Sequence, residues 1–575
     1  MSTYTDASLI YYPSGYKAGT AYSLKPTDGS GDLTFTRAST ATRVNESGLI
    51  EGVRTNLALY SNDLSNAVWI KTFTTITSNA AISPDGTTNA NKIVETTDNN
   101  LHRAGQGAIA VTSGQVYTFS FYAKAGERSE LELQRINTSG TVFNSISATT
   151  ADLTLGTLSV GSNLTSSSIN SVGDGWYRIS LSLTAIATGS GGLNIGMQKD
   201  GNVSYLGDGT SGVFIYRFQA EQSASATEYI PTTTTAVSVG MLANVPRIDY
   251  TGGGCSTLLL EPQRTNLIAY SEDFSNAYWT KNGASVTSGF TSPDGTTNAF
   301  KLVEDTSTGS HYLFKNIGSA DGSTNTASVF AKKGERTSIT LYSGANFTDS
   351  STFNLENGTS VDNGTSTSKI QLISNGWYKC SVTSVNKIVR TYIMINNGTT
   401  SYTGDGTSGV YIFGASLEAG SYPTSYIPTL GTAVTRVKDE TSTTIIPTMT
   451  GVSEFTWFFD NTDMDVLVSV VVYMQLNLSG GALRYYSTNG GRFRGSTYFG
   501  DVNAIGKLAV KCDGTTLSMF KNGVKSASTL ASALGTFVNF SGFNQGGESF
   551  SGGMQSMILF PTALSDAEII ALTTI

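Results

Sequence analysis

Two histidines and several repeated carboxylates are the residues of this 575-residue chain whose types could support catalysis or metal binding. A Ser-His-Asp enzyme needs a well-placed histidine, and a glycosidase needs two carboxylates that flank one bond. His102 and His311 have no metal-ligand partner nearby in the sequence, so we expect both to be exposed loop residues. No acidic pair stands out from the repeated background. The sequence therefore predicts a protein that is not an enzyme.

Four aspartates lie in turn motifs that each occur twice. Asp85 and Asp294 belong to SPDGTTNA sequences, and Asp208 and Asp405 belong to GDGTSGV sequences. An aspartate in a turn accepts hydrogen bonds from the backbone that follows it. Clustered loop oxygens are also the ligands that Ca²⁺ prefers. Turn formation and a structural calcium site are therefore both open interpretations, and no other cofactor is expected.

Aromatic side chains supply the candidate ligand contacts. Sugar binding needs exposed aromatic faces beside hydrogen-bonding side chains. Tyr122 and Phe330 occupy equivalent positions in two repeated strands, opposite the expected core face, and are the candidates for this role. Trp176 and Trp377 lie in GWY sequences, and we expect them in the core, with a sugar platform as the alternative.

A second candidate cluster combines aromatic and basic residues on a predicted C-terminal loop. It could contact a glycan or a protein, and a solvated loop without a ligand is the alternative. Its members are Tyr485, Tyr486, Arg492, Arg494 and Tyr498.

The elements that must position these residues form a duplicated domain. RTNLALYSNDLSNAVWIK at residues 54–71 returns as RTNLIAYSEDFSNAYWTK at residues 264–281. SPDGTTNA, GER, GWY, GDGTSGV and YIPT then follow in the same order in each copy. The period is far too long for a solenoid repeat, so each copy should be a folded unit with its own core.

The composition favours an all-β protein. The chain is 39% hydrophobic and only 14% charged, with 62 glycines and 27 tyrosines. Residues 114–135 predict a hairpin whose first strand points Tyr117, Phe119, Phe121 and Ala123 to one face. Short strands and frequent turns without helical segments predict antiparallel sandwiches. Ser565 with Glu568 predicts the capping box of a single C-terminal helix.

The domain organisation follows from the repeats and from changes of pattern between them. The N-terminal arm is too short to form a hydrophobic core alone. It must therefore pair with another domain, another copy of the chain or a different protein. We expect two tandem antiparallel jelly-roll sandwiches, a C-terminal lectin-like β-sandwich and an extended N-terminal arm. The boundaries are an arm at 1–53, an inserted jelly roll at 54–240, a connector at 241–263, a second jelly roll at 264–432 and a terminal sandwich at 433–575.

Charge and cysteine content exclude several partners. The net charge is −8 without a basic tract, so no nucleic-acid partner is expected. No apolar run approaches the ~20 residues of a membrane span, and the first residues do not resemble a secretory signal. Cys255, Cys380 and Cys512 are scattered and odd in number, which predicts reduced thiols in a protein made in a cytoplasm.

The motifs together resemble the carbohydrate-binding-module-like jelly rolls of bacteriophage fibre and spike proteins. The signature is RTNLxxYSxxFSNAxWxK followed by SPDGTTNA, GER, GWY and YIPT. FTRASTATRVNESGLIE and PRIDYTGGGCSTLLLEPQRTNL are also similar to segments of phage virion proteins, where they follow each other closely; here a jelly roll is inserted between them. The end of the chain, with GKLAVKCDGTTLSMFKNGVK and ILFPTALSDAEIIALTTI, resembles a concanavalin or laminin-G-like sandwich.

The resemblance implies a virion structural protein, made in the host cytoplasm and assembled as a tail fibre, head fibre, spike or other capsid or tail appendage. It implies a homotrimer that contacts other virion proteins through its N-terminal arm and adheres to host cell-surface polysaccharide. A purely architectural head or tail decoration without sugar binding is the alternative. A polysaccharide depolymerase is disfavoured by the missing acidic pair and the lack of a β-helix repeat.

Overall fold

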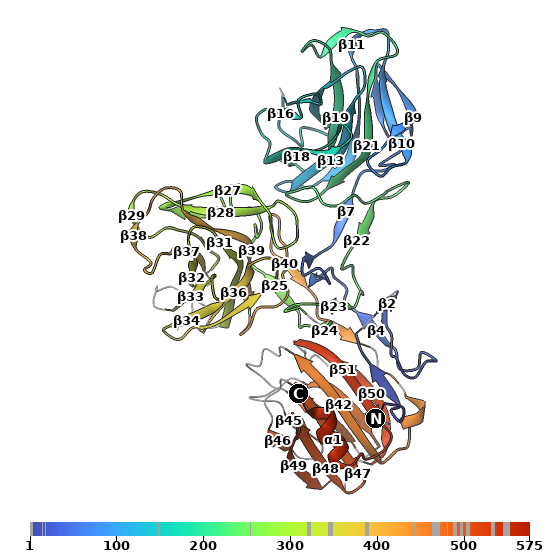
Figure 1. The fold of residues 1–575 in the computed structure, drawn as a ribbon, viewed down its shortest axis with the longest axis vertical. Helices are drawn as coiled ribbons and strands as arrows, with labels where there is room; N and C mark the ends of the chain where they lie inside the picture. Colours follow the sequence, from blue (N-terminus) through green and yellow to red (C-terminus); the bar gives the residue numbers. More distant parts are fainter. Residues whose placement is uncertain are drawn as a thin grey trace.

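The protein is all-β and its ribbon forms three lobes in the computed structural model (Figure 1). The two repeats form one lobe each, and both chain termini lie at the third. Among the described residues, no helix is both long and apolar enough to cross a membrane. The structure describes residues 4–13, 15–17, 19–147, 149–253, 255–318, 324–342, 349–385, 390–441, 444, 446–462, 472–479, 481–486, 492–494, 498–501, 506–530, 535–543 and 552–574.

The first jelly roll packs two antiparallel six-stranded sheets around one core. The first sheet has the order β17 (Ser166–Gly173), β18 (Trp176–Thr184), β13 (Val116–Ala125), β21 (Gly212–Glu221), β10 (Thr88–Glu95) and β9 (Thr74–Ile82). The second has the order β16 (Thr157–Ser159), β15 (Thr150–Asp152), β14 (Glu130–Asn137), β19 (Gly189–Gln198), β12 (Arg103–Val111) and β8 (Ile70–Thr72). A small separate pair consists of β11 (Asn99–Leu101) and β20 (Ser204–Leu206).

The hairpin predicted over residues 114–135 is wrong. β13 pairs with β18 and β21, whereas β14 pairs with β15 and β19, so the chain crosses between sheets after β13. Gly126 makes this crossing possible, because a Cβ at that position would lie 2.4 Å from the carbonyl oxygen of Gly212. The predicted alternation is confirmed, since Tyr117, Phe119 and Phe121 all enter the core. Alternation fixes which face of a strand is buried, but it does not fix the pairing partner.

The second jelly roll repeats this architecture. One sheet has the order β27 (Ala284–Phe290), β28 (Ala299–Glu304), β39 (Gly409–Ala419), β31 (Thr324–Lys333), β36 (Trp377–Val385) and β35 (Thr367–Leu372). The other has the order β26 (Thr280–Asn282), β30 (Tyr312–Asn316), β37 (Arg390–Asn396), β32 (Ser338–Tyr342), β33 (Ser350–Asn354) and β34 (Thr359–Asn363). The small pair is β29 (Thr308–Gly309) with β38 (Tyr402–Thr403).

A two-stranded stem closes the base of each jelly roll. β7 (Arg54–Asn56) pairs with β22 (Val237–Val239), and β25 (Arg264–Asn266) pairs with β40 (Val434–Arg436). The buried Asn56 of the RTN sequence donates from Nδ2 to the carbonyl of Ile230 at 2.8 Å, and Asn266 donates equivalently to Ile427 at 2.9 Å. Each stem thus brings the two ends of its jelly roll together, which allows a whole domain to be inserted between two neighbouring segments.

The third lobe is a sandwich of a large and a small sheet. The large sheet has the order β23 (Arg247–Asp249), β24 (Thr257–Leu260), β51 (Gly552–Phe560), β42 (Glu454–Thr462), β47 (Gly506–Asp513), β48 (Thr516–Lys521) and β49 (Val524–Leu530), with β1 (Leu9–Tyr11) also paired to β51. The small sheet has the order β46 (Tyr498–Asp501), β45 (Arg492–Arg494), β44 (Gly481–Tyr486), β43 (Val472–Leu478) and β50 (Phe537–Phe543). A 3₁₀ turn, η1 (Pro447–Met449), precedes β42.

Helix α1 (Asp566–Thr573) packs against the large sheet, with Ile569 buried against Phe458 and Phe520. The predicted capping box is confirmed: the Ser565 hydroxyl accepts from the backbone N–H of Glu568, and the Glu568 carboxylate accepts from the backbone N–H of Ser565.

Segments from both sides of the inserted jelly roll complete this third lobe. Leu9, Tyr11 and Phe35 from the N-terminal segment and Leu258 from the expected connector all lie in the core of the terminal sandwich. Of the three partners considered for the N-terminal arm, another domain of the same chain is the one observed. The remaining short strands of this region are β2 (Tyr16–Lys17), β3 (Thr20–Ala21), β4 (Leu33–Thr36) and β41 (Glu440–Thr441) in one sheet, and the pair β5 (Arg43–Val44) and β6 (Ile50–Glu51).

Candidate functional site

The repeated motifs form a structural network at one end of each jelly roll. Arg128 of the first GER sequence donates from Nε and Nη2 to the two carboxylate oxygens of Glu95 at 2.8 and 2.6 Å. The Tyr205 hydroxyl donates to the same carboxylate at 2.8 Å. Arg336 and Glu304 form the equivalent pair in the second jelly roll. Both copies share these residues, which stabilise the fold. A functional difference between the two jelly rolls must therefore come from residues that the copies do not share.

Both histidines belong to this buried end, so the prediction that they are exposed loop residues is wrong. His102 is 1% exposed and His311 is fully buried. The Nδ1 atom of His102 lies 2.7 Å from the Phe73 carbonyl oxygen, and that of His311 lies 2.6 Å from the Gly283 carbonyl oxygen. Each imidazole thus contacts a backbone carbonyl that also accepts from a backbone N–H group, that of Thr96 at Phe73 and that of Asp305 at Gly283. The isolated sequence does not reveal this contact.

The four repeated aspartates accept hydrogen bonds within their own turns. Asp208 Oδ1 accepts from the backbone N–H groups of Thr210 and Ser211, at 2.8 and 2.7 Å. Hydrogen bonding from Ser211 is the largest influence that lowers the pKa of Asp208 well below its usual range. Asp405, Asp85 and Asp294 accept from the following turn in the same way. In the described part of the chain, no group of three or more His, Cys, Asp and Glu residues is placed to hold a metal ion. Calcium binding therefore stays a prediction.

Tyr122 lies in an aromatic row on the sheet of the first jelly roll that contains β13. The ring centroid of Tyr122 is 5.9 Å from that of Tyr216, and the Arg178 guanidinium lies over the Tyr122 ring at 5.7 Å. At the other side, the Arg217 guanidinium lies 4.6 Å from the Tyr216 ring and 4.9 Å from the Tyr229 ring. We call Arg178, Tyr122, Tyr216, Arg217 and Tyr229 the aromatic row. Apart from the buried Tyr216, its members are half-buried.

One carboxylate fixes the middle of the aromatic row. Asp85 accepts from the Tyr216 hydroxyl and forms an ion pair with Arg217 at 3.1 Å. The hydrogen bond from the Tyr216 hydroxyl is the largest influence that lowers the pKa of Asp85 well below its usual range. Burial opposes this shift, and the hydroxyls of Ser83 and Thr87 add to it. The row therefore offers an ionised carboxylate, two guanidinium groups and aromatic faces on one surface.

Arg217 occupies a backbone conformation that usually belongs to glycine. Its φ is +51°, at the position where the second jelly roll carries Gly414 with φ +59°. A non-glycine residue in this left-handed region costs on the order of 1–2 kcal/mol. The first jelly roll thus keeps a strained arginine in the aromatic row although the fold accommodates a glycine there.

The equivalent surface of the second jelly roll is covered by the chain itself. Phe330, at the position of Tyr122, is 3% exposed, so its prediction as an exposed sugar contact is wrong. Ile50 packs on it together with Trp377, Phe413 and Tyr426. The cover is held by hydrogen bonds from the Ile50 backbone N–H to the Pro293 carbonyl at 2.9 Å and from the Thr42 hydroxyl to the Tyr426 carbonyl at 2.5 Å.

No such cover lies on the first jelly roll among the described residues. Pro84, the counterpart of the buried Pro293, is exposed, and Val172, the counterpart of the half-buried Ile373, is 44% exposed.

The tryptophans of the two GWY sequences do not differ between the copies. Trp176 and Trp377 are both buried, which confirms the prediction that they lie in the core.

The C-terminal candidate residues lie on strands, and the prediction that they form a loop is wrong. Tyr486 pairs with Arg492 across β44 and β45, and Arg494 pairs with Tyr498 across β45 and β46. Tyr485 pairs with Phe493. The side chains of the five candidates, Tyr485, Tyr486, Arg492, Arg494 and Tyr498, lie outside the described part of the structure.

The sequence analysis missed four members of the aromatic row, which are Arg178, Tyr216, Arg217 and Tyr229. The signal for Arg217 was available, because the aligned strands VFIYRFQAE and VYIFGASLE place an arginine opposite a glycine. The distances that join it to Tyr216 and Asp85 required the folded sheet.

The comparisons with known proteins do not assign a function. No known family model matches the chain, and no curated protein matches it. Among solved structures, the chain is similar to the N-terminal CBM22-1-CBM22-2 tandem domain of Xyn10C from Paenibacillus barcinonensis, at 12% identity and a TM-score of 0.20. That match covers 64% of this chain and 98% of the other. A TM-score this low carries no argument about function, which must come from the site.

Proposed function

We propose that the chain is a non-catalytic glycan-binding protein of a bacteriophage particle, and that the aromatic row contacts polysaccharide on the host surface. The observation that carries the proposal is the open aromatic row of the first jelly roll, in which a strained Arg217 lies between Tyr216 and Tyr229. Sugar rings present C–H groups that pack on aromatic faces, and their hydroxyls pair with guanidinium and carboxylate groups. Tyr122, Arg178, Arg217 and Asp85 supply both kinds of contact.

An architectural role is the second candidate, and one observation favours it. In the second jelly roll, the equivalent surface buries Ile50 of the same chain, so a surface of this kind can hold protein. As a head or tail decoration, the protein would use the open row for a neighbouring subunit. Attachment to the particle would use the exposed side chains of the N-terminal segment, among which Tyr4 is 51% and Leu24 is 53% exposed.

Glycan binding by the full-length protein tests the proposal. We expect binding on an array of bacterial surface polysaccharides, and Tyr122→Ala should weaken it about tenfold, since an aromatic contact contributes on the order of 1.5 kcal/mol. Leu155→Ala is the matched control, because Leu155 is 73% exposed next to β16 in the other sheet. Failure of the wild-type protein to bind any glycan would favour the architectural role.

Two further measurements address the remaining parts of the proposal. Release of reducing ends from host capsule would reveal a depolymerase, which the proposal excludes. We also propose the homotrimer that the resemblance implies. The mass of the purified protein in solution tests this assembly, and a monomer would contradict it.

A further inference from the structure

The SPDGTTNA turns of the two jelly rolls have different surroundings, although their sequences are the same. In the first jelly roll, Asp85 Oδ2 accepts from the Tyr216 hydroxyl and from the Arg217 guanidinium, the latter at 3.1 Å. The amide of Asn89 donates to the same oxygen at 3.2 Å. One guanidinium therefore balances the charge of this carboxylate.

The corresponding carboxylate of the second jelly roll, Asp294, has lost two of these three donors. Phe413 and Gly414 stand where the first copy has its tyrosine and its arginine, so the hydroxyl and the guanidinium are both missing. Among the described residues, the one donor to Asp294 Oδ2 is the amide of Asn298, at 3.4 Å. Asp294 Oδ1 still accepts from the backbone of its own turn.

A second carboxylate joins Asp294, because Glu272 stands where the first jelly roll has Asn62. The Asn298 amide lies against both carboxylates, since its Nδ2 atom donates to Glu272 Oε2 and to Asp294 Oδ2, at 3.4 Å each. In the part of the chain that the structure describes, neither carboxylate forms an ion pair with a lysine, arginine or histidine. The second copy thus has two carboxylates where the first has one carboxylate and one guanidinium.

The amide oxygen beside these carboxylates has no donor. Asn298 is 7% exposed, and its Oδ1 atom has no hydrogen-bond partner within the described residues. Only the NH₂ group of an amide can donate to carboxylates, so the two contacts fix which way the amide points. A buried oxygen without a partner indicates a bound water or ion. The Asn89 oxygen of the first copy is also unpaired, so the two sites differ in their charge.

A proton on Glu272 is the alternative to a bound cation. Burial, followed by the nearby Asp294, raises the pKa of Glu272 to about 7, and the hydroxyl of Tyr426 donates to Glu272 Oε1 at 3.0 Å. Below pH 7 the proton reduces the repulsion between the two carboxylates. Above pH 7 both carboxylates are ionised, and a cation between them becomes favourable.

We propose that Glu272, Asp294 and the Asn298 amide oxygen bind one Ca²⁺ ion, which takes the place of the guanidinium of the first jelly roll. Carboxylate and amide oxygens are ligands that Ca²⁺ prefers, and water would complete its shell of about six to eight oxygens. Because the set has only two carboxylates, we expect a Kd on the order of 10⁻⁴–10⁻³ M.

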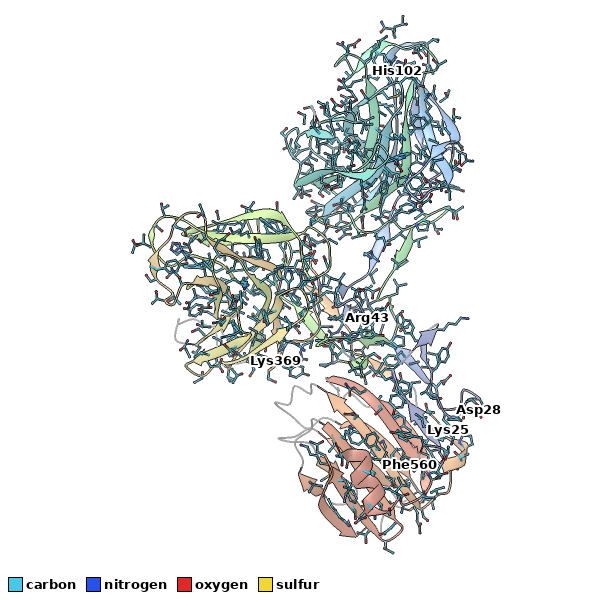
Figure 2. The ribbon with its side chains drawn as sticks, in the orientation of Figure 1. Lys25, Asp28, Arg43, His102, Lys369 and Phe560 are labelled. Atoms are coloured by element: carbon cyan, nitrogen blue, oxygen red, sulfur yellow. The ribbon has the colours of Figure 1, made fainter. Side chains whose placement is uncertain are left out.

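The site lies next to the cover, which consists of residues 42–50. The Ile50 backbone N–H donates to the carbonyl of Pro293 in the same turn, and Ile50 packs on Tyr426. Figure 2 labels Arg43 of the cover near the junction of the second jelly roll with the third lobe. A bound ion would fix the turn and the tyrosine that the cover contacts, so Ca²⁺ should also hold the cover in place.

Calcium titration of the full-length protein, after treatment with EDTA, tests the proposal. Calorimetry at pH 8 gives the affinity, and thermal unfolding in CaCl₂ or EDTA gives the stabilisation. We expect CaCl₂ to raise the thermal midpoint of the second jelly roll by a few degrees and to slow hydrogen exchange at Ile50, and NaCl of equal ionic strength to do neither. Binding should be weaker at pH 6, because Ca²⁺ must displace the proton from Glu272.

Glu272→Gln should weaken Ca²⁺ binding at least tenfold, because one of the two charged ligands is lost. The variant removes a buried charge and should be as stable as the wild type in EDTA at pH 8, so a lost response to Ca²⁺ would not reflect unfolding. Asp405→Asn is the matched control, since Asp405 lies in the other repeated turn and already forms an ion pair with Arg336 at 3.4 Å. Its affinity for Ca²⁺ should equal that of the wild type.

Three outcomes would overturn the proposal. No binding of Ca²⁺ to the wild-type protein at pH 8 would show that a proton alone serves this pair of carboxylates. Equal stabilisation by NaCl would show screening and not a bound ion. Unchanged affinity in Glu272→Gln, or loss of binding in Asp405→Asn, would place the ion at another site.

Discussion

Arg37 and Asp439 form an ion pair of 2.8 Å with both side chains fully buried, although 402 positions separate them in the chain. Asp439 also pairs with Arg247 and accepts from the backbone N–H of Glu261 at 2.9 Å. One carboxylate therefore joins the N-terminal segment, the segment between the jelly rolls and the segment that follows the second jelly roll.

Asp439→Asn should destabilise this junction by about 3–5 kcal/mol, because it leaves buried guanidinium groups without their counter-charge. Hydrogen exchange should accelerate in β4 and β41, which lie next to the pair, and urea should unfold the third lobe at lower concentration. Lys333→Met is the control, since the Lys333–Glu356 pair is exposed and should contribute less than about 1 kcal/mol. An equal effect of both variants would argue against a special role for the buried network.

Glu272 should make the second jelly roll less stable as the pH rises. Burial, followed by the nearby Asp294, raises the pKa of Glu272 from its ordinary value of 4.5 to about 7. A carboxyl whose pKa is raised in the folded state stabilises the fold fully below its unfolded pKa, and this contribution is lost as the pH rises towards 7. The loss is on the order of 1–3 kcal/mol.

Thermal unfolding of Glu272→Gln tests this direction of the pH dependence of stability. The variant should remove the pH dependence between about 4.5 and 7 and should be the more stable protein at pH 8. The first jelly roll carries Asn62 at the equivalent position, so its own unfolding transition serves as an internal control. A variant that is less stable than the wild type at pH 8 would contradict the prediction.

Leu9→Ala should weaken the third lobe and leave both jelly rolls unaffected. Leu9 is 1% exposed and pairs with Leu559 of β51, so its truncation leaves a cavity in the core that costs about 2–5 kcal/mol. Urea unfolding with hydrogen exchange would locate the effect to β51. Tyr4→Ala, at an exposed residue of the same segment, should change stability by less than about 0.5 kcal/mol.

Arg217→Gly should separate function from stability at the aromatic row. The second jelly roll has Gly414 at this position, so the substitution relieves a left-handed arginine and should leave the thermal midpoint unchanged or raise it. Glycan binding should fall because the guanidinium is lost. Glycan binding should therefore weaken without a fall in the melting midpoint, and a variant that both binds normally and melts normally would remove Arg217 from the site.

Much of the local structure could be predicted because it depends on neighbours in the sequence. The alternation in β13 predicted that Phe119 and Phe121 face the core, and the spacing of Ser565 and Glu568 predicted the helix cap. The order of the repeated motifs predicted two copies of one domain. Each of these features follows from the period of a strand, the geometry of a cap or the similarity of two sequences.

Where a feature depends on contacts between segments that are distant in the sequence, the prediction was wrong or the feature was missed. β13 and β14 were expected to pair because they are adjacent, yet the chain crosses to the other sheet between them. The residues next to His102 in the sequence do not indicate that it is buried. Its buried position follows from the Phe73 and Tyr205 carbonyls that it contacts. Phe330 looks equivalent to Tyr122 in the sequence, but Ile50 covers it from a segment on the far side of an inserted domain.

The sequence by itself determined the all-β class, the duplication and the residues that could form an aromatic surface, because composition, periodicity and repetition are local properties of the chain. Only the tertiary structure decided which of the two equivalent surfaces stays open and which buried arginines and carboxylates form pairs. Those outcomes depend on which distant segments meet. Residues 42–50 cover one jelly roll and not the other, and Arg37, Arg247 and Arg436 converge on two carboxylates only after the stems bring the ends of each jelly roll together.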